Sequence, residues 1–315
     1  MNEIKLKAYA KINLSIDVTG KRSDGYHYVK MIMQQIKLHD EIGLKYVEKD
    51  AGGLIGITSD LEELPKDSSN IAWKAAVLMR ERFPDKAKGN IFIHIKKNIP
   101  MAAGLAGGSA DAAAVLHGLN TLWECGLTVS ELMNLGLRLG ADVPFCIMGQ
   151  TAANAAAAEF PCLITPSGES VSTCALAEGI GEILTPLKPL EAFVILCKPD
   201  ISVVTAEIYK SLVLEDISKR PDTAAIISGL QHGDFHAVTS AMYNVLEEVS
   251  ARKYPIIREE ILRLREAADG EMAMMSGSGP TVFALISRES RARDIFNKHS
   301  MCKNRFLCET SIPLS

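Results

Sequence analysis

Apolar and polar residues alternate near the start of the chain. Between Ala10 and Val18 every second residue is apolar, and the polar residues between them include Lys11 and Asn13. Successive side chains of a strand point to opposite faces, so this pattern predicts a strand whose polar face carries Lys11 and Asn13. Two glycines and an Asp-Gly pair within residues 19–27 then predict a loop.

The rest of the first half mixes strand and helix patterns. Residues 29–47 predict two further strands around a tight turn, and residues 90–100 predict a strand that ends in a proline. Residues 67–83 predict a helix, because apolar residues recur there at helical spacing after Ser68 and Ser69, either of which would cap it.

A second helix signal lies further along the chain. Thr128 and Glu131 stand three residues apart, the spacing of a capping box, and predict a helix that ends at Gly140. Asp142 would then lie in a loop between this helix and an apolar strand. By position alone, an ordinary turn aspartate explains Asp142 better than a functional group does.

The second half continues the mixture without a regular βαβ rhythm. It predicts a strand at 192–200, helices around 221–230, 234–248 and 255–268, a glycine loop at 275–280 and a strand at 281–287. Such a mixture favours an α+β fold with two lobes. Residues 153–175 are low in charge and rich in alanine, which predicts an insertion in a surface loop; a hidden helix-strand unit is the alternative.

Composition narrows the class of protein. The chain has 315 residues, of which 47% are hydrophobic and 23% charged, as in a globular protein of one or two domains. With a formal net charge of −4 and no dense Lys/Arg run, nucleic acid is not an expected partner. No apolar run reaches the ~20 residues of a membrane helix, and residues 1–18 alternate and carry charges, so we expect a cytoplasmic protein without a membrane anchor.

The cysteines and histidines give little sign of a metal site. The seven cysteines include no C-x-x-C pair, which favours thiols of a reducing compartment over a disulfide framework or zinc. His232 and His236 have the i, i+4 spacing of one helix face, but no further ligand stands near them in the sequence. We therefore expect no protein-bound metal.

The glycine-rich stretch from Pro100 to Ser109 has three explanations: a linker, close helix packing or an anion cradle. It lies between an apolar strand and an alanine-rich segment, Ala110–Leu119, so a linker fits poorly. Its glycines allow positive φ and close approach of a ligand, and Ser109 stands where an N-cap belongs. The free N–H groups and dipole of the following helix would favour a phosphate. The spacing is neither that of a Walker P-loop nor G-x-G-x-x-G.

Three stretches resemble the motifs of the GHMP kinases, in the order of that family. They are "AYAKINLSIDV" in the first strand, "PMAAGLAGGSADAAAV" in the glycine stretch and "MSGSGPTVFAL" near the end. The resemblance implies a two-lobed α+β fold, with a ribosomal-protein-S5-like N-terminal lobe at 1–180 and a ferredoxin-like α/β sandwich at 181–315. The active site would lie in the cleft between the lobes.

The same resemblance implies an ATP-dependent small-molecule kinase and assigns its residues. Asp142 of "GADVP" would be the catalytic carboxylate and Lys11 its partner in the cleft, although a solvated strand face explains Lys11 equally well from the sequence alone. ATP would be bound by Asn70, Lys97, Pro100, Met101, Ala102, Ala103, Gly104, Leu105, Ala106, Gly107, Gly108 and Ser109. The loop with Gly277, Ser278 and Gly279 would support the phosphate loop.

The acceptor substrate is implied by residues outside the phosphate loop. The "DGYH" turn resembles that of family members that bind a cytidine diphosphate-linked polyol, with Tyr26 stacking on cytosine and His27 bonding its edge. Tyr209 would cover the other ring face, and Thr205 and Asn13 would line the site. The alternatives are a kinase of the homoserine or mevalonate type, whose substrates have no base, and a catalytically silent nucleotide-binding relative.

Three further expectations complete the resemblance. Mg²⁺ would be held mainly by the ATP phosphates and water, and Asp111 would turn away from them. Gln150 departs from the family, which usually has a small turn residue there. The chain would act as a monomer or a homodimer.

Overall fold

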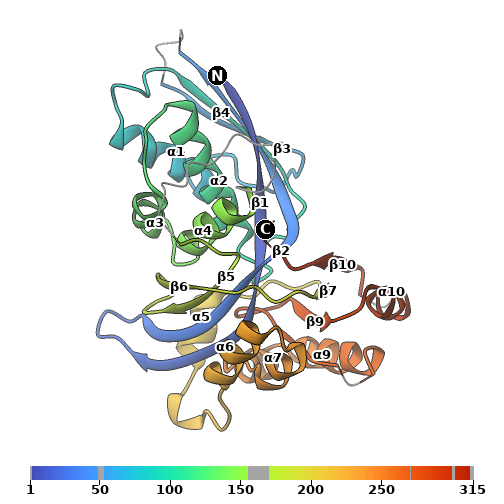
Figure 1. The fold of residues 1–315 in the computed structure, drawn as a ribbon. Helices are drawn as coiled ribbons and strands as arrows, with labels where there is room; N and C mark the ends of the chain where they lie inside the picture. The colour runs from blue at the N-terminus through green and yellow to red at the C-terminus, as the bar shows by residue number, and fades with distance from the viewer. Residues whose placement is uncertain (1, 49–52, 155–169, 270, 300–301, 313–315) are drawn as a thin grey trace.

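The computed structural model describes residues 2–48, 53–154, 170–269, 271–299 and 302–312, and it contains two β-sheets with helices packed against them (Figure 1). The strands of the first sheet are β1 (Glu3–Lys21), β2 (His27–Val47), β3 (Ile55–Ser59), β4 (Asn90–Lys96), β5 (Cys174–Glu178) and β6 (Ile183–Leu187). Those of the second are β7 (Phe193–Lys198), β8 (Ala273–Met275), β9 (Val282–Ile286) and β10 (Asn304–Glu309). The mixed α+β prediction is confirmed.

The helices fall into two groups that follow the two sheets. The first group is α1 (Ile71–Arg82), α2 (Gly107–Leu122), α3 (Val129–Leu137) and α4 (Val143–Asn154). The second is α5 (Thr205–Ser211), a 3₁₀ turn (Leu214–Asp216), α6 (Thr223–His232), α7 (Phe235–Ala241), α8 (Leu246–Lys253), α9 (Pro255–Ala267) and α10 (Glu289–Lys298). Helices α2 and α4 contact β1 and β2, whereas α9 and α10 contact strands of the second sheet (Figure 1).

The sheets have the strand orders β3-β4-β2-β5-β6, with β1 paired to β2, and β10-β7-β9-β8. Apolar side chains from both sheets meet in one buried cluster, which includes Ile12 of β1, Ile32 of β2, Leu196 of β7 and Phe283 of β9. This shared core joins the two lobes directly, so the surfaces that face the cleft are held at a fixed separation. None of the described helices is long and apolar enough to span a membrane.

The prediction of two strands around a tight turn at 29–47 is wrong. Residues 27–47 form the single strand β2, which pairs with β1 along most of its length. The polar stretch that suggested a turn contains Asp40, whose side chain is fully buried and accepts hydrogen bonds from the N–H groups of Asn98 and Ile99. A polar residue in the middle of a strand is tolerated here because neighbouring backbone satisfies it.

The predicted strand after Asp142 is also wrong, because those residues form the helix α4. A short apolar run does not distinguish a buried helix from a buried strand. Gln150 is therefore no turn residue: it lies within α4, where its side chain donates to the carbonyl oxygen of Ala110 at 2.9 Å. The capping box of Thr128 and Glu131 is confirmed, but its helix ends at Leu137, before Gly140.

Three other boundaries differ from the sequence predictions. The helix expected at 234–248 is two helices, α7 and α8, because the backbone between them bonds to β1: the N–H of Ile16 donates to Tyr243 at 3.0 Å. The cap of α1 is Asn70, rather than a serine before it, because its side chain accepts the N–H of Ala72 at 2.9 Å. The first sheet extends through β6, past the lobe boundary drawn at residue 180.

The predicted insertion at 153–175 lies largely outside the described residues, at 155–169. Of its ends, Ala153 and Asn154 belong to α4, and β5 begins at Cys174. Between these elements the structure describes only residues 170–173, which belong to no helix or strand.

Stability should depend on pH through His117, which is buried in α2 with its Nε2 3.0 Å from the carbonyl oxygen of Ile147. Burial lowers the pKa of His117 to about 4, so below pH ~6.5 the unfolded chain binds a proton that the folded chain resists. We expect this residue to remove about 3 kcal/mol of unfolding free energy as the pH falls from ~6.5 to ~4.

Urea unfolding at a series of pH values measures this loss. His117→Gln keeps an N–H donor and should flatten the profile over that range, whereas His232→Gln, at an exposed histidine of α6, should leave it unchanged. Identical profiles for the wild type and His117→Gln would contradict the assignment.

Candidate active site

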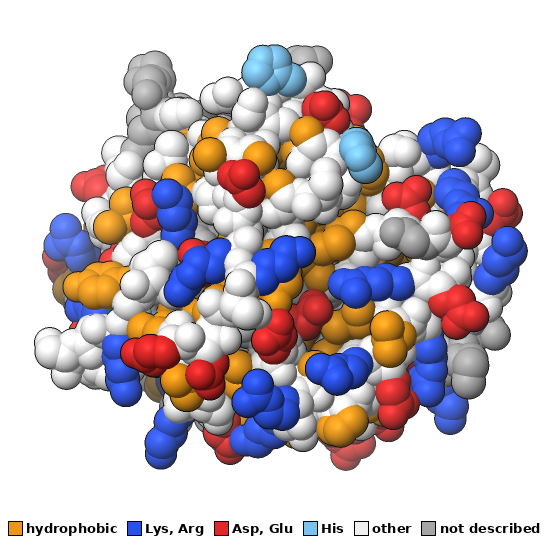
Figure 2. All heavy atoms as spheres, turned by 90° about the horizontal axis from the view of Figure 1, so that it is seen from below, with side chains coloured by type: hydrophobic (Ala, Val, Ile, Leu, Met, Phe, Trp, Pro, Cys, Tyr) orange, Lys and Arg blue, Asp and Glu red, His pale blue; other side chains and the backbone are white. Residues whose placement is uncertain are grey.

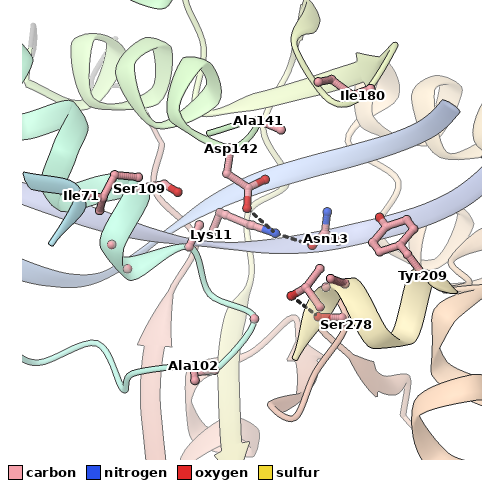
Figure 3. Close-up of a pocket in the computed structure, with 18 of the residues that line it drawn as sticks. Lys11, Asn13, Ile71, Ala102, Ser109, Ala141, Asp142, Ile180, Tyr209 and Ser278 are labelled. Atoms are coloured by element: carbon pink, nitrogen blue, oxygen red, sulfur yellow. Dashed lines mark hydrogen bonds and ion pairs between the residues drawn. The ribbon is translucent and has the colours of Figure 1, made fainter. Parts of the chain in front are cut away.

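A cavity of about 1120 Å³ lies between β1, the loop before α2, the start of α4 and the helix α5 (Figure 3). Every residue that the sequence assigned to catalysis, ATP, substrate or loop support lines it, except Leu105 and Gly279. The fold therefore brings residues as far apart in the sequence as Lys11 and Ser278 to one cavity. Over the face of the molecule seen in Figure 2, Lys and Arg side chains are interspersed with Asp and Glu.

The phosphate-loop candidate forms a strained backbone turn in front of α2. Gly104 has a φ of 74°, and Ala106 has a φ of 55° in the left-handed region. Ala106 is the N-cap of α2, and no side chain caps the helix, so the prediction that Ser109 is the N-cap is wrong: Ser109 is the third helical residue. The first intrahelical bond runs from Ala110 to Ala106, which leaves the N–H groups of residues 107–109 without helical acceptors.

The second glycine loop packs directly against the first. Ser276 Oγ donates to the carbonyl oxygen of Gly104 at 3.1 Å, and a Cβ on Gly104 would lie 2.4 Å from the carbonyl oxygen of Ser276. Gly277 would bring a Cβ within 3.1 Å of the same Gly104 oxygen. Two backbone segments 172 residues apart are thus in contact, and the contact requires that Gly104 and Gly277 carry no side chain.

Lys11 and Asp142 face each other across the cavity (Figure 3). The ammonium of Lys11 lies 3.8 Å from Asp142 Oδ2 and donates to Asn13 Oδ1 at 2.7 Å. The Lys11 side chain is 6% exposed and that of Asp142 is 33% exposed. The alternative of a solvated strand face for Lys11 is therefore wrong: the polar face of β1 is covered by the rest of the molecule, and the carboxylate of Asp142 is the more accessible member of the pair.

Lys97 is held beneath the phosphate loop by two carboxylates. Its Nζ pairs with Asp111 Oδ2 at 2.9 Å and with Asp40, and all three side chains are almost fully buried. Burial opposes the charge on Lys97, but Asp111 and Asp40 more than offset it and raise the pKa of the ammonium. The same ammonium lies 3.0 Å from the position that a Cβ on Gly107 would take, so a residue with a side chain at the start of α2 would crowd Lys97.

Sequence reasoning missed Asp40 as part of this arrangement. Asp40 has the same strand parity as the apolar Leu38, Ile42 and Leu44 of β2. An acidic residue at a position of the apolar face was the available signal, because such a residue needs a buried partner. Asp111 Oδ2 pairs with Lys97, while its buried Oδ1 has no hydrogen-bond partner among the described residues.

Asn70 lines the cavity but has a structural task as well. Its Oδ1 caps α1, and its Nδ2 donates to the carbonyl oxygen of Pro65 at 2.7 Å. Both ends of the side chain are engaged, so a contact with a nucleotide would use the second N–H of Nδ2 or the remaining lone pair of Oδ1.

Aromatic side chains gather at the other end of the cavity. The rings of His27 and Tyr209 have centroids 5.4 Å apart and are tilted by 39°, while Tyr26 is 60% exposed. Burial, and then the nearby Lys21, lower the pKa of His27, so its ring is neutral at pH 7 and offers one donor and one acceptor. Thr205 and Ser278 share a hydroxyl hydrogen bond of 2.8 Å beside these rings.

Comparison with known proteins agrees with this arrangement. The family model for the GHMP kinases N terminal domain matches residues 70–150, and that for the GHMP kinases C terminal matches residues 226–302. A solved 4-(cytidine 5'-diphospho)-2C-methyl-D-erythritol kinase aligns with a TM-score of 0.77 and 28% identity over 98% of this chain and 99% of that one. A homoserine kinase from Cytophaga hutchinsonii, 19% identical over 99% of this chain and 95% of that one, shares the fold with a TM-score of 0.69.

The chain belongs to the GHMP kinase family, and the expected two-lobed fold of that family is confirmed. Its full-length relatives show which group of GHMP kinases the chain resembles. It is 44% identical to the 4-diphosphocytidyl-2-C-methyl-D-erythritol kinase of Alkaliphilus metalliredigens over 96% of this chain and 94% of that one. It is 45% identical to that of Clostridioides difficile over 93% of this chain and 90% of that one. Within the family, the chain groups with the 4-diphosphocytidyl-2-C-methyl-D-erythritol kinases.

The contact between the two glycine loops can be tested with a matched pair of glycines. Gly104 and Gly126 have φ values of 74° and 72°, so alanine costs about 1–2 kcal/mol of backbone strain at either. Only at Gly104 would the new Cβ also collide with the second loop; at Gly126 nothing lies within 4 Å. Gly104→Ala should therefore raise the KM for ATP about tenfold or more, whereas Gly126→Ala should leave it near the wild-type value.

Steady-state kinetics give the two KM values, and urea unfolding of both variants separates a local effect from a general loss of stability. Equal KM values in the two variants would show that the contact between the loops does not position the phosphate site.

Proposed function

We propose that this chain transfers the γ-phosphoryl group of ATP to the 2-hydroxyl of 4-diphosphocytidyl-2-C-methyl-D-erythritol, a step of the non-mevalonate isoprenoid pathway. One observation carries the proposal: a single cavity joins an open helix N-terminus, a Lys11–Asp142 pair and a group of aromatic rings. The names of the full-length relatives support the same substrate.

The phosphates of ATP would bind at the start of α2. The N–H groups of residues 107–109 lie in the cavity lining and have no helical acceptor. Together with the positive end of the helix dipole they favour a polyanion. A γ-phosphate held there would be near β1, because the N–H of Lys11 donates to the carbonyl oxygen of Leu105 at 3.1 Å.

The acceptor hydroxyl would lie against Asp142. Phosphoryl transfer depends mainly on positioning and charge stabilisation, and the nucleophilic hydroxyl must lose its proton. Asp142 Oδ2 is the exposed acceptor of the pair, and it either takes this proton or orients the hydroxyl. The ammonium of Lys11, fixed by Asn13, would offset the negative charge that gathers between the carboxylate and the transferred group.

The cytidine would occupy the aromatic end. A neutral His27 can pair its donor and acceptor with the edge of cytosine, and the rings of Tyr26 and Tyr209 can stack on the two faces. Burial, and then Asp142, raise the pKa of Tyr209, so its hydroxyl stays neutral. Substrates of the homoserine or mevalonate type have no base for these rings. A silent relative would not need the Lys11–Asp142 pair that this chain retains.

Magnesium would accompany ATP, held mainly by phosphate oxygens and water. The buried Oδ1 of Asp111, which lines the cavity at the first turn of α2 and has no described partner, fits a role as acceptor for a water of that ion. When bound, Mg²⁺ neutralises charge on the phosphates. We expect the enzyme to work in the cytoplasm, as a monomer or a homodimer.

Asp142→Asn should remove the proposed catalytic carboxylate with little change in shape. We expect kcat to fall by about 10²–10⁴-fold, with the KM for ATP within a few-fold of wild type, because the substitution acts on the proton and not on the phosphates. The measurement is ATP consumption with Mg²⁺ and the cytidylyl substrate.

Glu178→Gln is the matched control for Asp142→Asn. It breaks the Lys30–Glu178 ion pair, whose N–O distance of 4.0 Å is similar to that of the Lys11–Asp142 pair. Both side chains are exposed, and neither lines the cavity. Near-normal turnover in Asp142→Asn would overturn the catalytic assignment, and a folded wild type that leaves the substrate unchanged would overturn the proposed function.

The aromatic end can be tested at Tyr209. Tyr209→Ala should raise the KM for the cytidylyl substrate about tenfold or more, since stacking on one base is worth about 1–3 kcal/mol. Tyr209→Phe keeps the ring and should keep the KM, and neither variant should change the KM for ATP. Equal effects of the two substitutions would mean that the hydroxyl, and not the ring, makes the contact.

A further inference from the structure

Two cysteines, a glutamate and a histidine from distant parts of the sequence meet inside the second lobe. Cys197 lies on β7, Glu260 on α9, His299 directly after α10, and Cys302 before β10. One ligand atom each from Cys197, Glu260 and Cys302 lies within 4.8 Å of the other two. The Nε2 of His299 is 2.5 Å from Glu260 Oε1. None of the four lines the active-site cavity.

The cluster is buried, which is unusual for these residue types together. The four residues are between 0% and 7% exposed. A buried carboxylate is costly unless a cation or several donors satisfy it. Glu260 Oε1 has His299, and Oε2 lies 3.7 Å from Arg263 Nη1, beyond good hydrogen-bond distance. The carboxylate of Glu260 also lies beside the two thiols, which could bind a cation together with it.

The neighbouring contacts of the thiols are weak. Cys302 Sγ lies 3.6 Å from the carbonyl oxygen of Lys198 and 3.5 Å from that of Asn304, and otherwise it faces Cys197. The thiols bond mainly within the cluster, Cys197 with Cys302 and with Glu260, so three soft or anionic ligand atoms converge from three elements. Two thiols beside a carboxylate are a ligand set suited to zinc, whereas magnesium and calcium prefer sites made of oxygen.

The spacing of the donors agrees with a tetrahedral ion. Zinc bonds of about 2.3 Å to sulfur and about 2.0–2.2 Å to oxygen place adjacent ligand atoms roughly 3.5–3.8 Å apart. The ligand atoms of Cys197, Glu260 and Cys302 all lie within 4.8 Å of one another, so side-chain rotations that shorten these separations would bring them to zinc-binding distances. His299 would hold the carboxylate of Glu260 through its ring, as histidines and carboxylates do around metal ligands.

We propose that Cys197, Cys302 and Glu260 bind a zinc ion, with His299 as the residue that positions Glu260. The ion has a structural role: it ties β7 and α9 to the segment that connects α10 with β10. No sequence motif predicts this zinc site, because the two cysteines are more than 100 residues apart and come together only in the folded lobe. The site is independent of the kinase chemistry, so the proposal does not rest on the proposed function.

The first measurement is the metal content of the full chain, made without a histidine tag and purified under reducing conditions from zinc-supplemented medium. We expect about one zinc per chain in the wild type and close to none in Cys197→Ser or Cys302→Ser. Cys308→Ser is the matched control, since Cys308 is a partly buried cysteine of β10 outside the cluster. It should retain the zinc.

A second measurement keeps the proposal testable if the cysteine variants fail to fold. Wild-type protein stripped with a chelator is titrated with Co²⁺, which should produce thiolate charge-transfer absorption in the near ultraviolet and the intense visible bands of a tetrahedral site. His299→Asn should bind the same amount of Co²⁺ with an affinity about 10–100-fold lower.

Three results would overturn the proposal. They are a wild type without zinc whose Co²⁺ titration lacks thiolate bands, a folded Cys302→Ser that keeps its zinc, and a Cys197–Cys302 disulfide found by mass spectrometry in protein kept under reducing conditions. Kinase turnover of the Cys302→Ser variant reports separately on whether the active-site lobe has folded.

Discussion

The active site depends on the backbone hydrogen bonds that β1 makes along the edge that does not pair with β2. One edge of this strand pairs with β2, which leaves the other edge with N–H and C=O groups that need partners. Lys11 uses its N–H to hold Leu105 in the phosphate loop, and Ile16 exchanges hydrogen bonds with Tyr243 and Val245 of the second lobe. A single strand therefore fixes the phosphate loop, the second lobe and the side chains of Lys11 and Asn13 relative to one another.

Buried charge gives the site its rigidity at an energetic cost. Lys97, Asp40 and Asp111 form a nearly dry ion cluster, and removing one member of such a cluster typically costs about 3–5 kcal/mol because the others stay charged. The cluster supports the turn that exposes the N–H groups of α2. The Lys11–Asp142 pair is built differently, with one buried member and one member that is accessible from the cavity.

The two lobes contribute different parts of one cavity. The first lobe supplies β1, the phosphate loop and the start of α4, and the second supplies α5 and the loop with Gly277 and Ser278. Their shared apolar core and the contact between Gly104 and Ser276 leave little freedom between them. The aromatic rings and the start of α2 therefore lie in one cavity at a separation that the shared core holds.

The sequence by itself determined the features that depend on local pattern or on contiguous wording. These are the alternation of β1, the capping box at Thr128, the glycine loop before α2 and three ordered motifs that resemble the GHMP kinases. Only the tertiary structure decided the rest: that 27–47 is one strand, that the residues after Asp142 are helical, and that Asp40 lies under the phosphate loop. The physical reason is that burial and pairing between distant segments override local preference. Asp40 suggests a turn because its partner, Lys97, lies 57 residues away in the sequence. The apolar run after Asp142 fits a helix and a strand equally well when only local sequence is considered.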